Sequence, residues 1–192
     1  MRWQVFLVFA FLAVVADVSF INVLNVGIMG GVTPSVCAAL VVFICLFASR
    51  LSALSGSLLL GALLDLSFPA LAGPAGNDVY LLGPHALGLL FGGYLVLQMR
   101  TMVFRQRALT LGVLAGLCIL AAGIVMTAIF IIRGWYGEGV NYMTQPSAFK
   151  ELVKHAAVAL YTALLGVPLG WVLLQTLPAW GFHMSHQRRI GR

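Results

Sequence analysis

The chain has 192 residues, of which 61% are hydrophobic and only 8% are charged, and its net charge is +6 at pH 7. This composition, with a mean hydropathy of +1.03, lies far outside the range of soluble domains and indicates an integral membrane protein. At about 20 residues per span, there is room for about six membrane-spanning helices and for no separate soluble domain. The basic residues stand at the ends of apolar segments, as orientation signals do, so the charge does not indicate a nucleic-acid partner.

The first part of the chain predicts three spans, over residues 3–24, 33–49 and 53–68. The first segment could instead be a signal peptide cleaved after Ala16, because Arg2 precedes an apolar core. Apolar residues that continue beyond Ala16 favour a retained helix. A glycine-rich loop then separates the first two spans.

The second part of the chain predicts three more spans, over residues 81–99, 108–132 and 152–177. Residues 67–79 contain prolines and glycines that end the preceding helix, and Gly83-Pro84 places the next helix start near His85. With this topology, eight Lys and Arg residues fall on the side of both chain ends and three on the other. Since basic residues mark the cytoplasmic side, both termini are expected there.

Two acids, Asp17 and Asp65, fall inside predicted spans, where a carboxylate must face protein, water or the membrane interface. Asp65 is either an interfacial residue that is solvated or caps a turn, or a buried contact that organises the outer loops or a small site. If the first and third helices are neighbours, the two acids could share an outer polar pocket with His85 or His155. His85, beside glycine and proline, fits a structural hydrogen-bonding role or a ligand role.

Glycines four residues apart allow two helices to approach closely. Three such pairs stand in the apolar segments and predict a compact bundle: Gly88 and Gly92, Gly112 and Gly116, and Gly166 and Gly170. The basic residues Arg100, Arg105 and Arg107 form a cluster that is expected to bind anionic lipid at the cytoplasmic face or, alternatively, a partner protein.

The motifs of soluble enzymes and metal sites are absent from the sequence, including Gly-x-Ser-x-Gly, the Walker motif, His-Glu-x-x-His and Cys-x-x-Cys. Cys37, Cys45 and Cys118 lie in apolar runs and are expected to pack as small hydrophobic residues, not as a disulfide or a metal site. We therefore predict no metal and no cofactor. A carboxylate dyad of Asp17 and Asp65 is a further hypothesis, and it requires the two carboxyl groups to lie within a few ångströms.

The stretch from Gly56 to Arg107 resembles the MreD family of rod shape-determining membrane proteins. The pattern that carries the resemblance is Gly61-Ala-Leu-Leu-Asp65-Leu66, followed after a loop by Gly83-x-His85-Ala86-Leu87, then Gly93-Tyr94 and Arg100. The likeness implies a structural or partner-contact core made of the matched positions Gly61, Leu64, Asp65, Gly83, Ala86, Leu87, Gly93 and Tyr94. His85 is added to this core, although it stands where the family more often has asparagine.

The resemblance also implies a function and a fold. Members of this family are non-enzymatic components of the bacterial cell-elongation machinery, which builds peptidoglycan at the inner membrane. They work with MreC, the actin-like MreB, RodA and a class B penicillin-binding protein. Their six-helix fold is similar to that of the substrate-binding components of energy-coupling-factor vitamin transporters.

Two functions are therefore expected above others. The first is a membrane scaffold that binds an MreC-like partner and helps to position cell-wall synthesis. The second is a small-molecule-binding membrane component with an outward-facing pocket near Asp17, Asp65 and His85, and it rests on the fold analogy alone.

Overall fold

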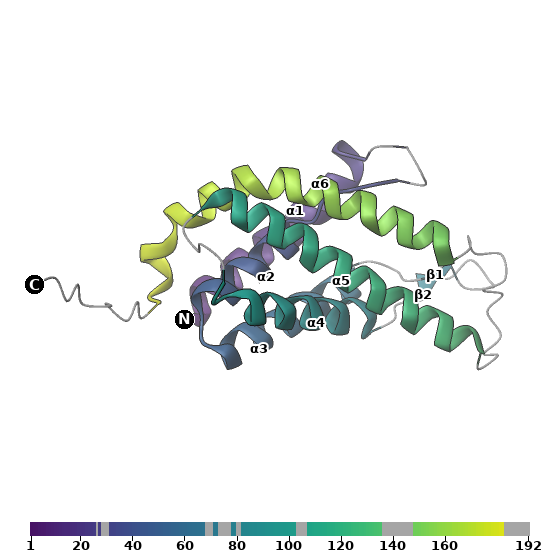
Figure 1. Cartoon of the computed structure of the whole chain (residues 1–192), viewed down its shortest axis with the longest axis horizontal. Helices are drawn as coiled ribbons and strands as arrows, with labels where there is room; N and C mark the ends of the chain where they lie inside the picture. The colour runs from purple at the N-terminus through teal and green to yellow at the C-terminus, as the bar shows by residue number, and fades with distance from the viewer. Residues whose placement is uncertain are drawn as a thin grey trace, which may run out of the picture.

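The computed structural model describes residues 1–25, 27, 31–67, 71–72, 78–79, 82–102, 107–135 and 148–182, and this part of the chain is almost entirely helical (Figure 1). Two strands of two residues each pair in antiparallel fashion, with Leu71 opposite Val79 and Ala72 opposite Asp78. The elements are α1 (Trp3–Val23), α2 (Val36–Phe47), α3 (Arg50–Ser67), β1 (Leu71–Ala72), β2 (Asp78–Val79), α4 (Pro84–Met99), α5 (Ala108–Trp135), α6 (Ala148–Gln175) and the 3-10 helix η2 (Leu177–Trp180).

The bundle has two distinct ends. At one end, which we call the terminal end, the backbone N–H of Arg2 donates to the carbonyl of Trp180 over 3.1 Å. At the other, the loop end, α2 and α4 begin. The two longest helices, α5 and α6, have 28 residues each and pack against one another more extensively than any other pair (Figure 1).

Helix α2 occupies the centre of the bundle, where it packs against all five other α-helices. Every residue from Cys37 to Leu46 is buried. A helix that is apolar on all sides is suited to this position, because it has no face to present to water. Its 12 residues extend over about 18 Å, less than the roughly 30 Å hydrocarbon layer of a bilayer. Helix α2 by itself is therefore too short to cross such a layer.

The other α-helices carry large apolar side chains on their outward faces, such as Phe11 on α1, which is 68% exposed, and Leu160 on α6, also 68% exposed. Three helical stretches are long and apolar enough to cross a membrane: Arg50–Ser67, Ala108–Ile132 and Phe149–Gln175. Two more, Trp3–Ser19 and Val36–Phe47, are apolar but shorter. These findings are consistent with a helical membrane protein, whereas six crossings remain a prediction.

The helix boundaries differ from the predicted spans by three or four residues at the starts of α2, α3 and α6 and at the end of α5. Helix α2 begins three residues after the predicted start because Ser35 serves as its N-cap, and its hydroxyl accepts from the N–H of Ala38. Helix α6 begins at Ala148, four residues early, since the charged residues there are good helix formers and do not end the helix. Helix α4 begins at Pro84, next to the predicted start.

The three glycine pairs lie at helix contacts, which confirms the prediction made from their spacing. A methyl group added to Gly92 would lie 2.7 Å from the carbonyl oxygen of Cys118 on α5. One added to Gly112 would lie 2.6 Å from the carbonyl oxygen of Ala163 on α6, and one added to Gly166 would lie 2.8 Å from the Cα atom of Gly112. These distances are too short for any side chain, so the helices α4, α5 and α6 touch through their backbones.

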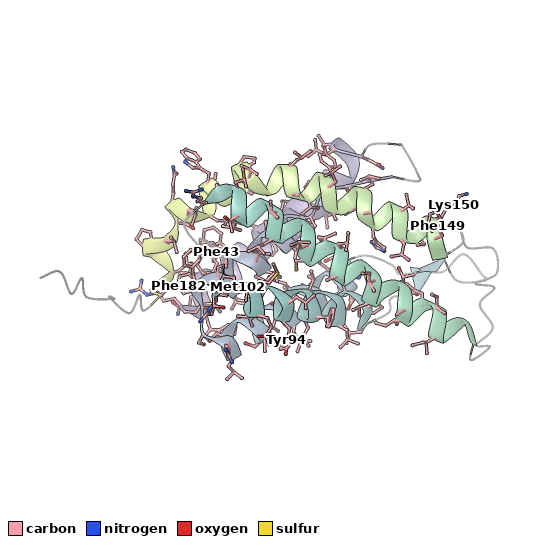
Figure 2. The ribbon with its side chains drawn as sticks, in the orientation of Figure 1. Phe43, Tyr94, Met102, Phe149, Lys150 and Phe182 are labelled. Atoms are coloured by element: carbon pink, nitrogen blue, oxygen red, sulfur yellow. The ribbon has the colours of Figure 1, made fainter. Side chains whose placement is uncertain are left out.

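An aromatic cluster holds the C-terminal segment against the terminal end of the bundle. The ring of Trp180 is fully buried, with ring centroids 4.9 Å from Phe9, 5.1 Å from Phe43 and 5.7 Å from Phe182. Its indole N–H donates to the hydroxyl of Thr176 over 3.0 Å. Figure 2 shows Phe43 and Phe182 together at this end. The cluster joins η2 to α1 and α2, which keeps both described ends of the chain on one side.

Candidate functional site: charged side chains at helix ends

Asp65, near the end of α3, caps the start of α4. Its carboxylate accepts from three backbone N–H groups, those of Gly83 over 2.8 Å, His85 over 2.9 Å and Ala86 over 3.1 Å. The ring nitrogen Nδ1 of His85 lies 2.8 Å from the same carboxylate. Because the first N–H groups of a helix have no partner in the helix and carry partial positive charge, a carboxylate is well suited to this place. Asp65 is 2% exposed, so it is a buried contact and not a solvated interfacial residue.

Gly61 and Gly83 allow this cap to form. Gly61 stands one turn before Asp65, and a methyl group there would lie 2.4 Å from the Cα atom of Ala86. Its missing side chain therefore lets the first turn of α4 rest directly on α3, beneath the carboxylate. Gly83 precedes α4 with φ of 134°, a conformation that glycine adopts readily and other residues rarely do. In the pattern Gly-x-x-x-Asp, the glycine at position 61 thus provides the close contact with α4, and the aspartate at position 65 caps the start of α4 from the same face of α3.

Asp17, near the end of α1, caps α2 in the same manner. Its carboxylate accepts from the backbone N–H of Val36 over 2.5 Å and of Cys37 over 3.2 Å, and from the hydroxyl of Ser35 over 2.9 Å. The backbone N–H of Ser35 in turn donates to the hydroxyl of Thr162 on α6 over 3.1 Å. This network joins α1, α2 and α6 at the loop end.

The two caps have the same construction. Asp17 and Cys37 are separated by 20 residues, as are Asp65 and His85. In both cases, the acid lies near the end of one helix and receives the first N–H groups of the next. The sequence Asp-x-Ser occurs at both positions, at Asp17 and at Asp65, and this recurrence could have revealed the relationship from the sequence. His85 occupies the place of Cys37, and the side chains at both places contact the capping carboxylate.

Arg100, just after α4, caps the opposite end of α2. Its guanidinium nitrogen Nη1 donates to the carbonyl oxygens of Ala48 over 2.8 Å and of Cys45 over 3.4 Å. The last carbonyls of a helix lack partners in the helix and carry partial negative charge, which a cation stabilises. Together with Asp17 at the start of α2, Arg100 satisfies the polar ends of a helix buried inside the protein.

This placement gives Arg100 an inward role that the predicted basic cluster did not include. Arg100 is half-buried, whereas Arg107 is exposed just before α5. Arg105 lies outside the described residues. The lipid-binding or partner-binding role of the three arginines remains a prediction.

The remaining positions of the predicted core fall into two groups. Leu64 and Ala86 are buried, and Gly93 lies against the hydroxyl of Ser57, 2.7 Å from the position that a methyl group would take. Leu87 and Tyr94 face outward, with 49% and 47% exposed. The buried group supports the packing of α3 against α4, whereas Leu87 and Tyr94 lie on the outer surface of the bundle.

The predicted outer polar pocket is brought together only in part. Asp65 and His85 are in direct contact, but Asp17 belongs to the separate network at α2. No hydrogen bond joins the two acids in the part of the chain that the structure describes, and each carboxylate is occupied by a helix start. His155 lies against Gly123 of α5, 2.5 Å from the position that a methyl group on that glycine would take.

The three cysteines pack as the sequence predicted, since all are free and buried. The described residues contain no cluster of His, Cys, Asp and Glu side chains that could hold a metal ion. Comparison of the chain with protein-family models, with curated proteins and with solved structures finds no match in any of the three.

Proposed function

We propose that this protein is a non-enzymatic membrane scaffold of the bacterial cell-elongation machinery, related to the MreD family, and that it binds an MreC-like partner. In this proposal the chain crosses the inner membrane six times, with the terminal end in the cytoplasm. MreB, RodA and a class B penicillin-binding protein are further expected partners in the same assembly.

The observation that carries the proposal is the structural use of the residues that resemble the family. Gly61, Asp65, Gly83 and Ala86 meet at one point, where α3 supports and caps the start of α4. The motif therefore describes a rigid joint between two helices, which is what a scaffold needs to hold a binding face in a fixed shape. A motif for catalysis would instead leave reactive groups accessible.

The polar groups inside the bundle support the same interpretation. Both carboxylates and the guanidinium of Arg100 bind helix ends, and every one of these contacts is internal. A dyad that activates water needs two carboxylates side by side, whereas Asp17 and Asp65 cap different helices. A protein that binds an anionic molecule can use the free backbone N–H groups at a helix N-terminus. At the N-termini of α2 and α4, these groups already donate to the carboxylates of Asp17 and Asp65.

Affinity purification from membranes in mild detergent tests the proposal. The tagged chain is expected to recover an MreC-like protein in stoichiometric amounts. A matched experiment with an unrelated apolar membrane protein of similar size, expressed at the same level, controls for nonspecific recovery. Repeated recovery of the bait alone would contradict the proposal, and a small molecule bound stoichiometrically to the purified chain would favour the transporter-like alternative.

A further inference from the structure

The three helices that begin at the loop end each have a carboxylate at their start. Asp17 accepts from the first N–H groups of α2, Asp65 accepts from those of α4, and Glu151 stands in the first turn of α6. Negative charge is favourable there because the first N–H groups of a helix carry partial positive charge. The loop end therefore supplies the negative charge that its own helix starts need.

The three helices that begin at the terminal end have the opposite charge at their starts. None of α1, α3 and α5 has an acidic residue in its first turn. Arg2 directly precedes α1, Arg50 is the first residue of α3, and Arg107 directly precedes α5. An arginine at a helix start adds to the positive charge of the helix end and does not oppose it. The terminal end thus concentrates positive charge from arginines and from helix ends.

Arg2 and Arg50 lie at nearly the same level on neighbouring helices. The ring of Phe6, four residues after Arg2, lies 3.3 Å from the position that a methyl group on Gly56 would take, and Gly56 is six residues after Arg50. Because a helix rises about 1.5 Å per residue, the two arginines differ in height along the bundle by only about 3 Å. They therefore form a pair at the starts of α1 and α3.

This pair of arginines is accessible at the terminal end. Both side chains are exposed, and among the described residues neither forms an ion pair. The side chain of Arg2 lies against the end of η2, where its Nε atom is 3.2 Å from the position that a methyl group on Gly181 would take. The acidic residues that the structure describes all belong to the loop end (Figure 1): Asp17, Asp65, Asp78 and Glu151.

Large apolar side chains stand beside the arginines. Trp3 follows Arg2 and is 43% exposed, and Leu51 follows Arg50 and is 83% exposed. Met102, which Figure 2 shows at the terminal end, is 88% exposed. Helix α3 is long and apolar enough to cross a membrane and begins at Arg50, so this arginine marks the boundary of the apolar segment. Tryptophan and arginine at such a boundary are typical of the level of lipid headgroups.

We propose that the terminal end carries a binding surface for anionic phospholipid, which we call the terminal surface: Arg2, Trp3, Arg50, Leu51 and Met102. The two guanidinium groups bind the lipid phosphate, for which arginine has suitable geometry, and the apolar side chains contact the acyl chains next to the headgroup. The phosphate also supplies negative charge at the starts of α1 and α3, which none of the described residues supplies.

Lipid matches this surface better than a soluble acidic protein does, because lipid offers negative charge and apolar contact at the same depth. The terminal surface differs from the basic cluster predicted from the sequence, since the guanidinium of Arg100 binds the end of α2. The inference does not depend on the scaffold function proposed above.

Equilibrium binding of fluorescent phosphatidylglycerol to the full chain in neutral detergent tests the proposal, with fluorescent phosphatidylcholine as the uncharged reference. Arg2→Gln and Arg50→Gln should each weaken the binding of phosphatidylglycerol about 5-fold, and the double variant about 25-fold, as expected for arginines at an anionic membrane surface. The double variant should bind the two lipids almost equally. Lys150→Gln removes one charge at an exposed position of the loop end and should leave the binding unchanged.

Two further measurements keep the test independent of how well the variants fold. Raising the salt concentration from about 0.1 M to about 1 M shortens the Debye length from about 10 Å to about 3 Å and should reduce the preference of the wild-type chain for phosphatidylglycerol. Glycerol 3-phosphate carries a phosphate but no acyl chains, so it should not displace phosphatidylglycerol at equal concentration.

Several outcomes would overturn the proposal. These are equal binding of the two lipids by wild type, a preference that salt does not reduce, and a double variant of wild-type thermal stability that binds phosphatidylglycerol as wild type does. An equal loss in Lys150→Gln would show that net charge alone is responsible. Displacement by glycerol 3-phosphate would assign the surface to a soluble anion. Recovery of an acidic protein by wild type but not by the double variant, with lipid binding unchanged, would assign it to a protein partner.

Discussion

Replacement of Asp65 by leucine is expected to destabilise the bundle strongly, because the carboxylate satisfies the whole start of α4. The variant leaves three backbone N–H groups and the ring of His85 without their acceptor. Loss of a helix cap costs about 0.5–2 kcal/mol, and loss of a hydrogen bond to a charged group costs about 1.5–3 kcal/mol. Since these contacts share one acceptor, they are not additive, and we expect a total loss of about 2–4 kcal/mol.

Equilibrium unfolding in mixed detergent micelles measures this loss as a change in the free energy of unfolding. Asp65→Asn keeps one acceptor oxygen in place and should lose less than Asp65→Leu. Ser67→Ala is the matched control, because the hydroxyl of Ser67 is exposed and bonds only to the carbonyl of Leu63 in its own helix. An unfolding free energy for Asp65→Leu within about 0.5 kcal/mol of this control would refute the reasoning, since that is the range of neutral surface changes.

Three further outcomes follow from the packing. Gly61→Ala should cost about 1–3 kcal/mol of unfolding free energy, because the added methyl group meets the backbone of Ala86, whereas Gly27→Ala, where nothing lies within 4 Å, should be close to neutral. Arg100→Met should cost about 1.5–3 kcal/mol by removing the cap at the end of α2, and Arg50→Met, at an exposed position, should have little effect in the same assay. The three cysteines should resist a membrane-permeant maleimide in the folded protein and react after denaturation, and fast labelling of the folded protein would contradict their burial.

Composition and apolar runs were sufficient to predict a helical membrane protein and the approximate place of each helix. Glycine spacing predicted a compact bundle with close helix contacts, since close approach of helices has a simple sequence requirement, but it did not predict that α4, α5 and α6 make these contacts. The aromatic cluster around Trp180 was not predicted, because its members come from α1, α2 and the C-terminal segment, and their meeting depends on the tertiary fold.

The roles of the charged residues were predicted less well. Position in an apolar segment identifies Asp17 and Asp65 as exceptional, but not which helix start each one caps. The predicted pocket placed the two acids together because both were expected near the outer ends of their spans. In the structure, Asp17 instead caps α2 and Asp65 caps α4. Arg100 was assigned to the surface because it stands in a basic cluster. Its inward contact depends on α2 being short and central, which residues 33–49 alone do not reveal.

The central claim, a scaffold role in cell elongation, is tested most directly by depleting the protein in its own host and measuring cell shape. The account predicts that rod-shaped cells become round and stop inserting peptidoglycan along the side wall. It also predicts that the wild-type gene restores the rods, while Asp65→Leu restores them poorly and Ser67→Ala restores them fully. Cells that remain rod-shaped and continue side-wall synthesis after complete depletion would contradict the account.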